Sequence, residues 1–514
     1  MRVEDFLGRS AAALPDKVAL VAGERRLTFR ELDRASDALA AGLQGQGIGR
    51  GDRVVVFMDN SAEAVVAIFA ALKAGAVFSP INPSTKADKL AYVMNNCRAA
   101  ALVTLGRLVP VAEKALGETP SVKTVIVADD KGALPDGWIS FKDVVAAGDT
   151  PLRAAGIELD LAMLIYTSGS TGFPKGVMMT HQNVVAAATS ITSYLESRAD
   201  DIVLSVLPLS FDYGLYQALM TIKVGATLVL EKSFAFPQAI LQKINAEKVT
   251  GFPIVPTIAA LLLQMKDLRP GQFPTLRYLT NTAAALPTAH IERLQALFPG
   301  AQLFSMYGLT ECKRCTYLPP EELTRRPDSV GIAIPGTEAY VVDDDGTRVP
   351  PGVIGELVIR GPHVMKGYWE NPQATARALR PGPYEWEKVL YTGDLFRTDA
   401  EGFLYFVGRK DDIIKTRGEK VSPREVENVL IALAGVREVA VIGVDDPVLG
   451  LAIKAFVVVE PDTLTAQDVQ RHCARHLEDF MVPKHIEFRD ALPKSENGKI
   501  DRRALAAPVP EAAE

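Results

Sequence analysis

The sequence predicts an α/β protein with parallel-type sheets in its long N-terminal part and a smaller α+β unit near the C-terminus. Three observations support this. Helix-like and strand-like segments alternate over roughly the first 330 residues, short strands between Gly and Pro turns follow to about residue 406, and a separate helix–strand pattern begins after about residue 412.

The first part contains short apolar runs that fit buried strands, at 54–57, 100–104 and 124–128. Between the first two runs, Ser61 precedes a helix-forming segment, 62–74, which Gly75 closes. Because strands that alternate with helices usually lie parallel in one sheet, we expect sheets covered by helices on both faces.

The texture changes twice towards the C-terminus. Strands expected at 339–342 and 356–359 lie between turn residues and predict a small β-rich unit. The last part predicts two helices and two strands, namely 423–433, 439–444, 455–459 and 466–476. We expect the tail, 506–514, to be disordered.

Composition excludes several classes of protein. The formal net charge of -6 argues against a general nucleic-acid or membrane-surface binder. The N-terminus lacks the apolar core of a secretory signal, and the apolar stretch 64–72 is about half the ~20 residues that a membrane span needs. Four cysteines are too few for a disulfide scaffold, so we expect a reducing, cytoplasmic location and no integral membrane segment.

The most informative stretch is a hydroxyl-rich loop, IYTSGSTGFPKG, between an apolar strand and a helix start. Glycines let backbone N–H groups turn towards an anion, while hydroxyls and a lysine add donors and charge. The spacing is not that of a Walker A loop, because Lys175 is followed by Gly176. The predicted polyphosphate-binding residues are Thr167, Ser168, Gly169, Ser170, Thr171, Gly172 and Lys175.

This loop resembles that of the AMP-forming adenylating enzymes, a superfamily of acyl-CoA synthetases, nonribosomal peptide adenylation domains and firefly-type luciferases. The resemblance extends from Leu27 to Lys499 through several motifs in the same order. It implies a large domain, 1–408, of two α/β subdomains plus a small β-barrel-like subdomain. It further implies a hinge at 409–411 and a mobile C-terminal domain at 412–505.

The segment MYGLTE is similar to the adenine site of that family. The resemblance implies that Tyr307 stacks on adenine, that Thr310 contacts phosphate and that Glu311 helps to hold Mg²⁺. The chemistry agrees, because an aromatic face suits a base and a carboxylate suits a hard cation that bridges phosphates. Cys312 and Cys315 form a C-x-x-C with no second pair at zinc-site spacing, so we expect them to pack near this segment.

Three more residues complete the implied adenylation site. Asp394, in YTGDL, would accept hydrogen bonds from the ribose hydroxyls, and Arg409 would reach the same ribose. Lys499, in SENGKI, would contact the substrate carboxylate and the α-phosphate. The implied reaction is attack of a carboxylate on ATP, which forms acyl-AMP and releases pyrophosphate.

The resemblance also implies a second half-reaction. The small domain would rotate about Asp411, and Gly418 would then lie close to the thiol of coenzyme A (CoA). No carrier-protein domain follows the small domain in this sequence, so we expect CoA as the acceptor. A standalone ligase that loads a separate carrier protein is the alternative, and a non-catalytic nucleotide-binding protein is a remote one.

The acid itself is not readable from the sequence. The Phe211–Gly214 stretch resembles the Phe-Asp segment of amino-acid-activating domains, in which the Asp pairs with an α-amino group. An amino-bearing substrate therefore stays open beside a simple carboxylic acid. The residues expected to line the acyl pocket are Asp212, Tyr213, Thr257, Asn281, Thr282, Ala283 and Ser305.

Overall fold

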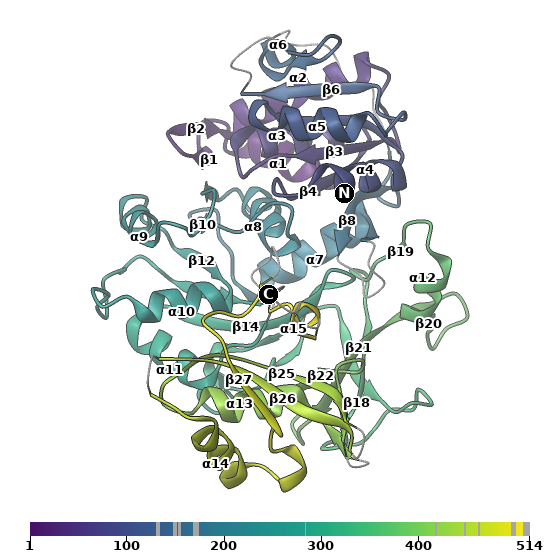
Figure 1. Ribbon diagram of the computed structural model, residues 1–514. Coiled ribbons are helices and arrows are strands. Elements are labelled where there is room, and N and C mark those ends of the chain that lie inside the picture. Colours follow the sequence, from purple (N-terminus) through teal and green to yellow (C-terminus); the bar gives the residue numbers. More distant parts are fainter. Residues whose placement is uncertain are drawn as a thin grey trace, which may run out of the picture.

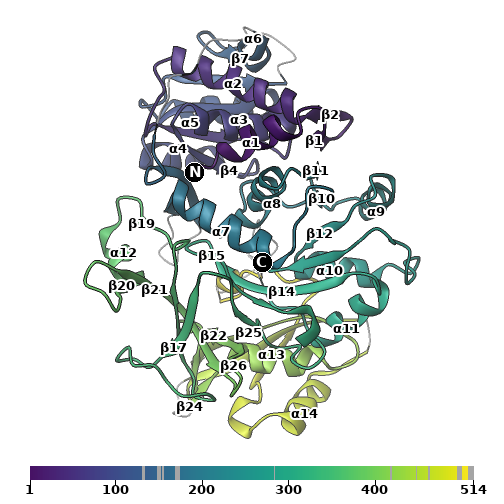
Figure 2. The same ribbon diagram turned by 180° about the vertical axis from the view of Figure 1, so that it is seen from behind.

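The computed structural model describes residues 1–129, 134–146, 152, 156–167, 174–282, 284–416, 419–446, 449–460, 463–494 and 500–506. Within these ranges the strands form four sheets. Figures 1 and 2 show most of the first sheet with its helices at the top, most of the second sheet in the middle, and most of the C-terminal elements at the bottom. The predicted mixed α/β class, with parallel sheets in the large N-terminal part, is confirmed.

The first sheet has the strand order β19-β9-β8-β4-β3-β5-β6-β7, in which the strands from β8 to β7 run parallel. Its strands are β3 (Arg53–Phe57), β4 (Val77–Ile81), β5 (Ala99–Leu105), β6 (Thr124–Ala128), β7 (Ile139–Ser140), β8 (Leu161–Thr167), β9 (Lys175–Thr180) and β19 (Gly367–Tyr368). The helices of this part are α2 (Phe29–Gly45), α3 (Ala62–Lys73), α4 (Ala87–Asn96), α5 (Val109–Leu116), α6 (Phe141–Ala146) and the 3₁₀ turn η1 (Gly106–Leu108).

Helix α3 illustrates how local sequence determines this layer. The Ser61 hydroxyl accepts a hydrogen bond from the Ala64 N–H at 3.1 Å and caps the helix. The helix is apolar on nearly every side and is buried over ten of its twelve residues. The helix expected at 62–74 is therefore present, and Gly75 follows it with a φ of 81°, a conformation that suits glycine.

The second sheet has the order β16-β15-β14-β13-β12-β10-β11-β1-β2 and is parallel from β14 to β1. Its strands are β1 (Val18–Ala22), β2 (Arg25–Thr28), β10 (Ile202–Ser205), β11 (Thr227–Leu230), β12 (Gly251–Ile254), β13 (Tyr278–Asn281), β14 (Gln302–Leu309), β15 (Lys313–Leu318) and β16 (Ile332–Ala333). The helices are α1 (Asp5–Ala13), α7 (His181–Tyr194), α8 (Asp212–Lys223), α9 (Pro237–Ala246), α10 (Pro256–Gln264) and α11 (Thr288–Leu297), with the 3₁₀ turn η2 (Pro320–Glu322).

Buried Asn60, just after β3 of the first sheet, forms hydrogen bonds with backbone groups of the part that contains the second sheet. Its amide nitrogen donates to the backbone oxygens of Leu207 and Glu231, both at 2.9 Å, and its oxygen accepts from the Leu209 N–H at 2.9 Å. Helix α7 runs between the two parts in both views (Figures 1 and 2). The relative position of the two sheets is thus supported by satisfied buried polar groups.

The third sheet is antiparallel and follows the order β17-β18-β21-β20, with β22 paired to β21. Its elements are β17 (Glu338–Val342), β18 (Gly355–Arg360), β20 (Leu379–Pro381), β21 (Lys388–Thr398), β22 (Leu404–Arg409) and helix α12 (Pro372–Ala378). The fourth sheet and its helices comprise β23 (Ile414–Thr416), β24 (Glu419–Val421), β25 (Val436–Asp446), β26 (Gly450–Val459), β27 (His485–Phe488), α13 (Pro423–Ile431), α14 (Ala466–His476), α15 (Arg502–Ala506) and the 3₁₀ turn η3 (Asp479–Met481).

The C-terminal elements have a hydrophobic core of their own. One large core extends from Val3 to Leu404, whereas a separate cluster extends from Ile414 to Met481. An independent core is what allows a small domain to move as a unit. Across the boundary, the Arg424 guanidinium lies 5.0 Å from the ring centroid of Phe406, and the Ser422 hydroxyl donates to the Val407 carbonyl.

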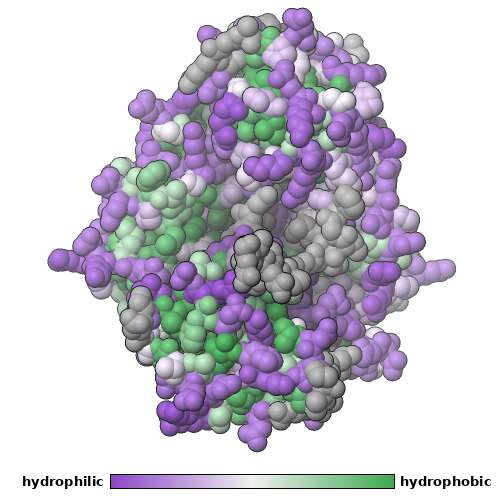
Figure 3. Space-filling model, viewed as in Figure 1, coloured by the Kyte–Doolittle hydropathy of each residue, from purple (hydrophilic) through white to green (hydrophobic). Residues whose placement is uncertain are grey.

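Hydrophilic and hydrophobic residues are interspersed on the face seen in Figure 3. Within the described ranges, no helix combines the length and the apolar character that crossing a bilayer requires.

Candidate functional site

The hydroxyl-rich loop joins the antiparallel strands β8 and β9, in which Thr167 lies opposite Lys175. Its central residues lie outside the described part of the chain; they are Ser168, Gly169, Ser170, Thr171 and Gly172. The Lys175 ammonium lies 5.3 Å from the ring centroid of Tyr368, which belongs to the neighbouring strand β19. The cation at the end of the loop is therefore held against an aromatic side chain.

The MYGLTE segment ends β14 and turns sharply into β15. A Cβ on Gly308 would lie 1.7 Å from the Lys313 carbonyl oxygen, so only glycine fits at this crossing. Lys313 has a φ of 61°, and its ammonium donates to the Thr310 carbonyl at 2.9 Å. This tight turn holds Thr310 and Glu311 between the two strands.

Glu311 is fixed through contacts with a third segment. The Tyr368 hydroxyl donates to Glu311 Oε1 at 2.7 Å, and the Met365 N–H donates to the Glu311 carbonyl at 2.8 Å. Burial, together with the neighbouring Glu311 carboxylate, raises the pKa of Tyr368, which keeps its hydroxyl protonated as a donor. Tyr368 thus contacts both Lys175 and Glu311, which come from separate predicted motifs.

Asp394 is the centre of the second group. It is 2% exposed, accepts a hydrogen bond from the Tyr307 hydroxyl at 2.5 Å and forms an ion pair with Arg409 Nε at 3.0 Å. Asp394 and Arg409 lie directly opposite each other on β21 and β22. Burial and the Asp394 charge raise the pKa of Tyr307 well above its usual value, so the phenol stays neutral.

The Tyr307 ring is positioned by aromatic neighbours. Its centroid lies 4.9 Å from that of Phe396 and 6.2 Å from that of Phe406. The Cys315 thiol lies 3.6 Å from the Tyr307 carbonyl oxygen, and burial raises its pKa well above the usual value. The expected packing of this cysteine near the adenine segment is therefore observed, as that of an unreactive buried thiol.

Glu311 is the one residue of the site predicted to hold Mg²⁺. Within the described ranges, no group of three or more His, Cys, Asp or Glu side chains could hold a metal ion. A carboxylate oxygen nevertheless suits Mg²⁺, which commonly takes one or two protein carboxylates and completes its shell with phosphate oxygens and water. Glu311 fits that pattern, since the Tyr368 hydroxyl uses only one of its acceptor positions.

The residues expected to line the acyl pocket come from neighbouring elements. Asp212 is the first residue of α8, and the Tyr213 hydroxyl lies 2.7 Å from the Thr280 carbonyl. Asn281, the last residue of β13, lies beside Ser305 in the middle of β14. Thr257 lies in the first turn of α10, Thr282 follows β13, and Ala283 lies outside the described residues.

The remaining predicted residues belong to the C-terminal part. Asp411 is exposed in the turn between β22 and β23, next to the Asp412 N–H, which donates to the Arg409 carbonyl at 3.0 Å. Gly418 and Lys499 lie outside the described residues.

Two residues that contact predicted site residues, Tyr368 and Arg314, were not predicted from the sequence. Tyr368 reaches Glu311 because β19 pairs with β9, a contact between segments about 190 residues apart that no local pattern encodes. Arg314 lies in β15, where its guanidinium carbon is 4.7 Å from the ring centroid of Tyr213. The signal available in the sequence was a pair of cations, Lys313–Arg314, in a segment otherwise expected to be buried.

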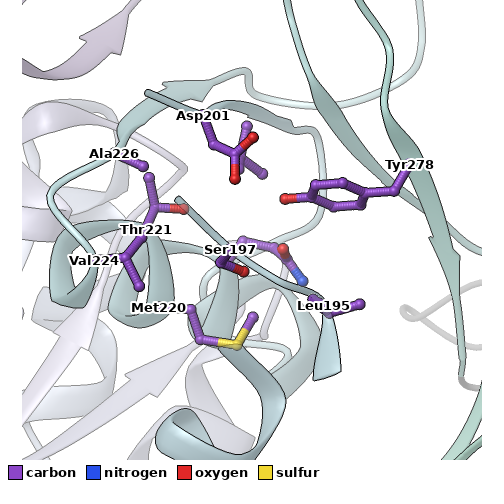
Figure 4. Close-up of a pocket in the computed structure, with 10 residues that line it drawn as sticks. Leu195, Ser197, Asp201, Met220, Thr221, Val224, Ala226 and Tyr278 are labelled. Carbon is purple, nitrogen blue, oxygen red and sulfur yellow. The ribbon is translucent and has the colours of Figure 1, made fainter. Parts of the chain in front are cut away.

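A small pocket lies at the other end of α8, and Figure 4 shows Asp201, Thr221 and Tyr278 with their oxygens directed into it. None of the predicted site residues lines it. The Asp201 carboxylate is already bound by the Arg277 guanidinium at 2.9 Å. We therefore assign this pocket no part in the adenylation site.

Similarity to known proteins extends over both parts of the chain. Residues 7–369 match the family described as AMP-binding enzyme, and residues 425–499 match the AMP-binding enzyme C-terminal domain. A long-chain-fatty-acid–CoA ligase of Escherichia coli is 34% identical over 98% of this chain and 93% of its own. An L-proline–[L-prolyl-carrier protein] ligase of Pseudomonas fluorescens is 31% identical over 97% and 98% of the two chains.

Among solved structures, an anthranilate CoA ligase in complex with anthranoyl-AMP superposes with a TM-score of 0.89 at 30% identity, covering 98% of this chain and 96% of that one. The matches span nearly the whole chain rather than the nucleotide-binding half alone. The chain therefore belongs to the AMP-binding enzyme family and is, as its motifs predicted, an AMP-forming acid–thiol ligase.

Proposed function

We propose that this ligase converts a carboxylic acid and ATP into acyl-AMP and pyrophosphate, and then transfers the acyl group to the thiol of CoA. The observation that carries the proposal is that residues from separate motifs contact one segment, the end of β14 and the following turn that contains Glu311. Tyr307 donates a hydrogen bond to Asp394. Four residues later, Glu311 accepts a hydrogen bond from Tyr368, whose ring also contacts Lys175. A nucleotide requires an aromatic ring for its base, a carboxylate for its ribose and a cation for its phosphates, all close together.

In the first step, an oxygen of the substrate carboxylate attacks the α-phosphorus of ATP while the bond to pyrophosphate breaks. The work of the protein is to position the reactants and to offset negative charge. Asp394 and Arg409 orient the ribose, Lys175 and the hydroxyl-rich loop hold the phosphates, and Lys499 stabilises the charge that develops between carboxylate and phosphate. Mg²⁺ held at Glu311 would offset charge on the departing phosphates.

In the second step, the CoA thiolate attacks the acyl carbon and AMP leaves. The proposal gives Asp411 the role of a hinge and places Gly418 beside the incoming thiol. The separate core of the C-terminal part supports such a rotation. The carrier-protein alternative is favoured by one observation, the similarity to an L-proline–[L-prolyl-carrier protein] ligase. The cytoplasmic location stays a prediction.

A pyrophosphate-release screen over carboxylic and amino acids, with and without CoA, tests the proposal. We expect acid-dependent release in the wild-type protein and thioester only when CoA is added. Lys499→Ala should slow acyl-AMP formation by about a thousandfold, yet leave ATP binding close to wild type. Acyl-AMP formation at the wild-type rate in that variant would remove Lys499 from the mechanism, and thioester formation only with an added carrier protein would favour the alternative acceptor.

A further inference from the structure

Arg314 has a buried guanidinium in which two neighbouring nitrogens, the open edge of the group, have no hydrogen-bond acceptor among the described residues. The residue is 4% exposed, and neither Nε nor Nη2 has a hydrogen-bond partner among the described residues. Its only hydrogen-bond contact there is between Nη1 and the Met220 sulfur at 3.9 Å. Arginine does not give up its proton in proteins, so this is a permanent buried charge.

The two unpaired atoms lie on the same edge of the guanidinium, the edge that binds a carboxylate with two parallel hydrogen bonds. Arg50 demonstrates the geometry in the same protein. Its Nε and Nη2 donate to the two carboxylate oxygens of Asp160 at 2.8 and 2.9 Å. At Arg314 the equivalent edge has no acceptor within the part of the chain that the structure describes, and a buried charge without a partner costs several kcal/mol in general.

The surroundings of Arg314 supply aromatic walls and further unpaired polar atoms. Its guanidinium carbon lies 4.7 Å from the ring centroid of Tyr213 and 5.9 Å from that of Tyr216. The Tyr216 hydroxyl and the Thr316 hydroxyl are also buried without a partner among the described residues. Buried polar groups in proteins normally have partners, so each of these unpaired atoms calls for an explanation.

These residues adjoin the predicted acyl pocket. Tyr213 is one of the residues predicted to line that pocket, and Asp212 begins the same helix. The Asp212 carboxylate lies near enough to oppose the lowering of the Lys313 pKa by burial, yet among the described residues it forms no ion pair with Arg314. Lys313, the preceding residue, adds a second buried positive charge: it is 3% exposed, and its ammonium donates to the Thr310 carbonyl.

We propose that Arg314 is a substrate-binding residue that selects dicarboxylic acids, holding the second carboxylate while the first is adenylated. The inference rests on the proposed function, since it deepens the identity of the acid. A carboxylate supplies both the negative charge and the two acceptors that the open edge requires, whereas a hydrocarbon tail supplies neither. The second carboxylate stays ionised and takes no part in bond making.

The test pairs each linear dicarboxylic acid of a homologous series with the monocarboxylic acid of the same carbon number. The measurement is kcat/KM for pyrophosphate release. We expect the wild-type protein to prefer the dicarboxylic partner by about tenfold or more, and Arg314→Met to lose or reverse that preference. Arg314→Lys, which keeps the charge without the two-donor edge, should fall between them.

Arg50→Met is the matched control, because it removes an arginine whose carboxylate partner is already within the protein. Its substrate preference should equal that of the wild type. A wild-type preference for monocarboxylic or amino acids, or a dicarboxylate preference that survives Arg314→Met, would overturn the assignment.

A binding measurement separates this inference from the proposed reaction. Thermal stabilisation by the acids without ATP depends on the pocket and not on catalysis. If a dicarboxylic acid stabilises the wild-type protein but not Arg314→Met, the role of Arg314 is supported, even when no acid releases pyrophosphate. Absence of pyrophosphate release with every acid would instead reject the proposed reaction. Equal stabilisation, or none, across each pair of acids counts against Arg314.

Discussion

The Tyr307 hydroxyl donates a 2.5 Å hydrogen bond to Oδ2 of Asp394, so the aromatic and acidic residues expected to hold a nucleoside are already joined. Asp394 Oδ1 also forms an ion pair with Arg409 Nε at 3.0 Å. A carboxylate offers about four acceptor positions, so one carboxylate can accept from protein donors and from ribose hydroxyls together. The contacts also fix the direction in which the carboxylate points before any ligand arrives.

Asp394→Asn is expected to raise KM for ATP by about tenfold or more. The substitution removes the negative charge that Arg409 faces and replaces one acceptor oxygen with a donor, which opposes both the Tyr307 and the ribose hydroxyls. The measurement is the initial rate of pyrophosphate release as a function of ATP concentration.

Asp201→Asn is the control for this variant, because Asp201 is equally buried and is paired with Arg277 away from the site. It should lower the melting temperature and leave KM for ATP unchanged. If both substitutions raised KM to the same extent, the effect would be one of general stability, and Asp394 would lose its assigned role.

Glu311→Gln is expected to raise the Mg²⁺ concentration needed for half-maximal activity by about tenfold or more, because an amide oxygen carries no charge to attract the cation. Tyr368→Phe keeps the Glu311 carboxylate and removes only the hydroxyl 2.7 Å away, so its effect should be smaller. Titrating Mg²⁺ after chelation with EDTA measures both. An unchanged Mg²⁺ requirement in Glu311→Gln would place the metal elsewhere.

Asp411→Pro is expected to impair thioester formation more than acyl-AMP formation. Proline fixes its own φ and disfavours the helical region for Lys410, which limits a rotation at this position. The described backbone hydrogen bonds include none donated by the Asp411 N–H, so the ground state should tolerate the ring. Separate assays of pyrophosphate exchange and thioester yield measure the two steps.

Asp411→Ala serves as the comparison, since it removes the carboxylate and keeps backbone freedom. It should affect both steps little. A parallel fall of exchange and thioester yield in Asp411→Pro would argue that the turn matters for folding or for adenylation rather than for rotation.

Regular periodicity made much of the fold predictable. The helix expected at 466–476 has those bounds in the structure, and the strand expected at 124–128 does as well. The helix expected at 423–433 ends at Ile431 instead. The pairing of β1 with β11 was not predictable, because it joins segments about 200 residues apart and depends on tertiary packing rather than on local pattern.

The candidate site likewise contains residues that could be predicted from the sequence and residues that could not. Motifs with a chemical signature, such as the segment that contains Glu311 and the one that contains Asp394, were recognisable from residue type and order. Tyr368 was not, because a tyrosine in a short strand carries no mark of the carboxylate it contacts. Arg314 was hidden for a different reason: a charged residue in sequence is by default a surface residue, and only burial reveals it as exceptional.

Buried His363 makes the stability of the protein sensitive to acid. It is 2% exposed and precedes Met365, whose N–H donates to the Glu311 carbonyl. Burial lowers the pKa of His363 from 6.5 to about 4. Between these values the unfolded chain binds more protons than the folded one, so this contribution to stability is complete above pH 6.5 and is lost as the pH falls towards 4.

Glutamine has no titratable group, so in His363→Gln the free energy of unfolding should fall less steeply as the pH is lowered. From about pH 7 to about pH 5, the wild-type protein should lose on the order of 2 kcal/mol through this group, a loss that the variant escapes. Melting temperatures recorded across that range measure the difference. His485→Gln, at an exposed position, should keep the wild-type slope. If wild type and His363→Gln lost stability in parallel, the acid sensitivity would have to arise from other groups, because a neutral, buried imidazole at 363 requires the two curves to diverge.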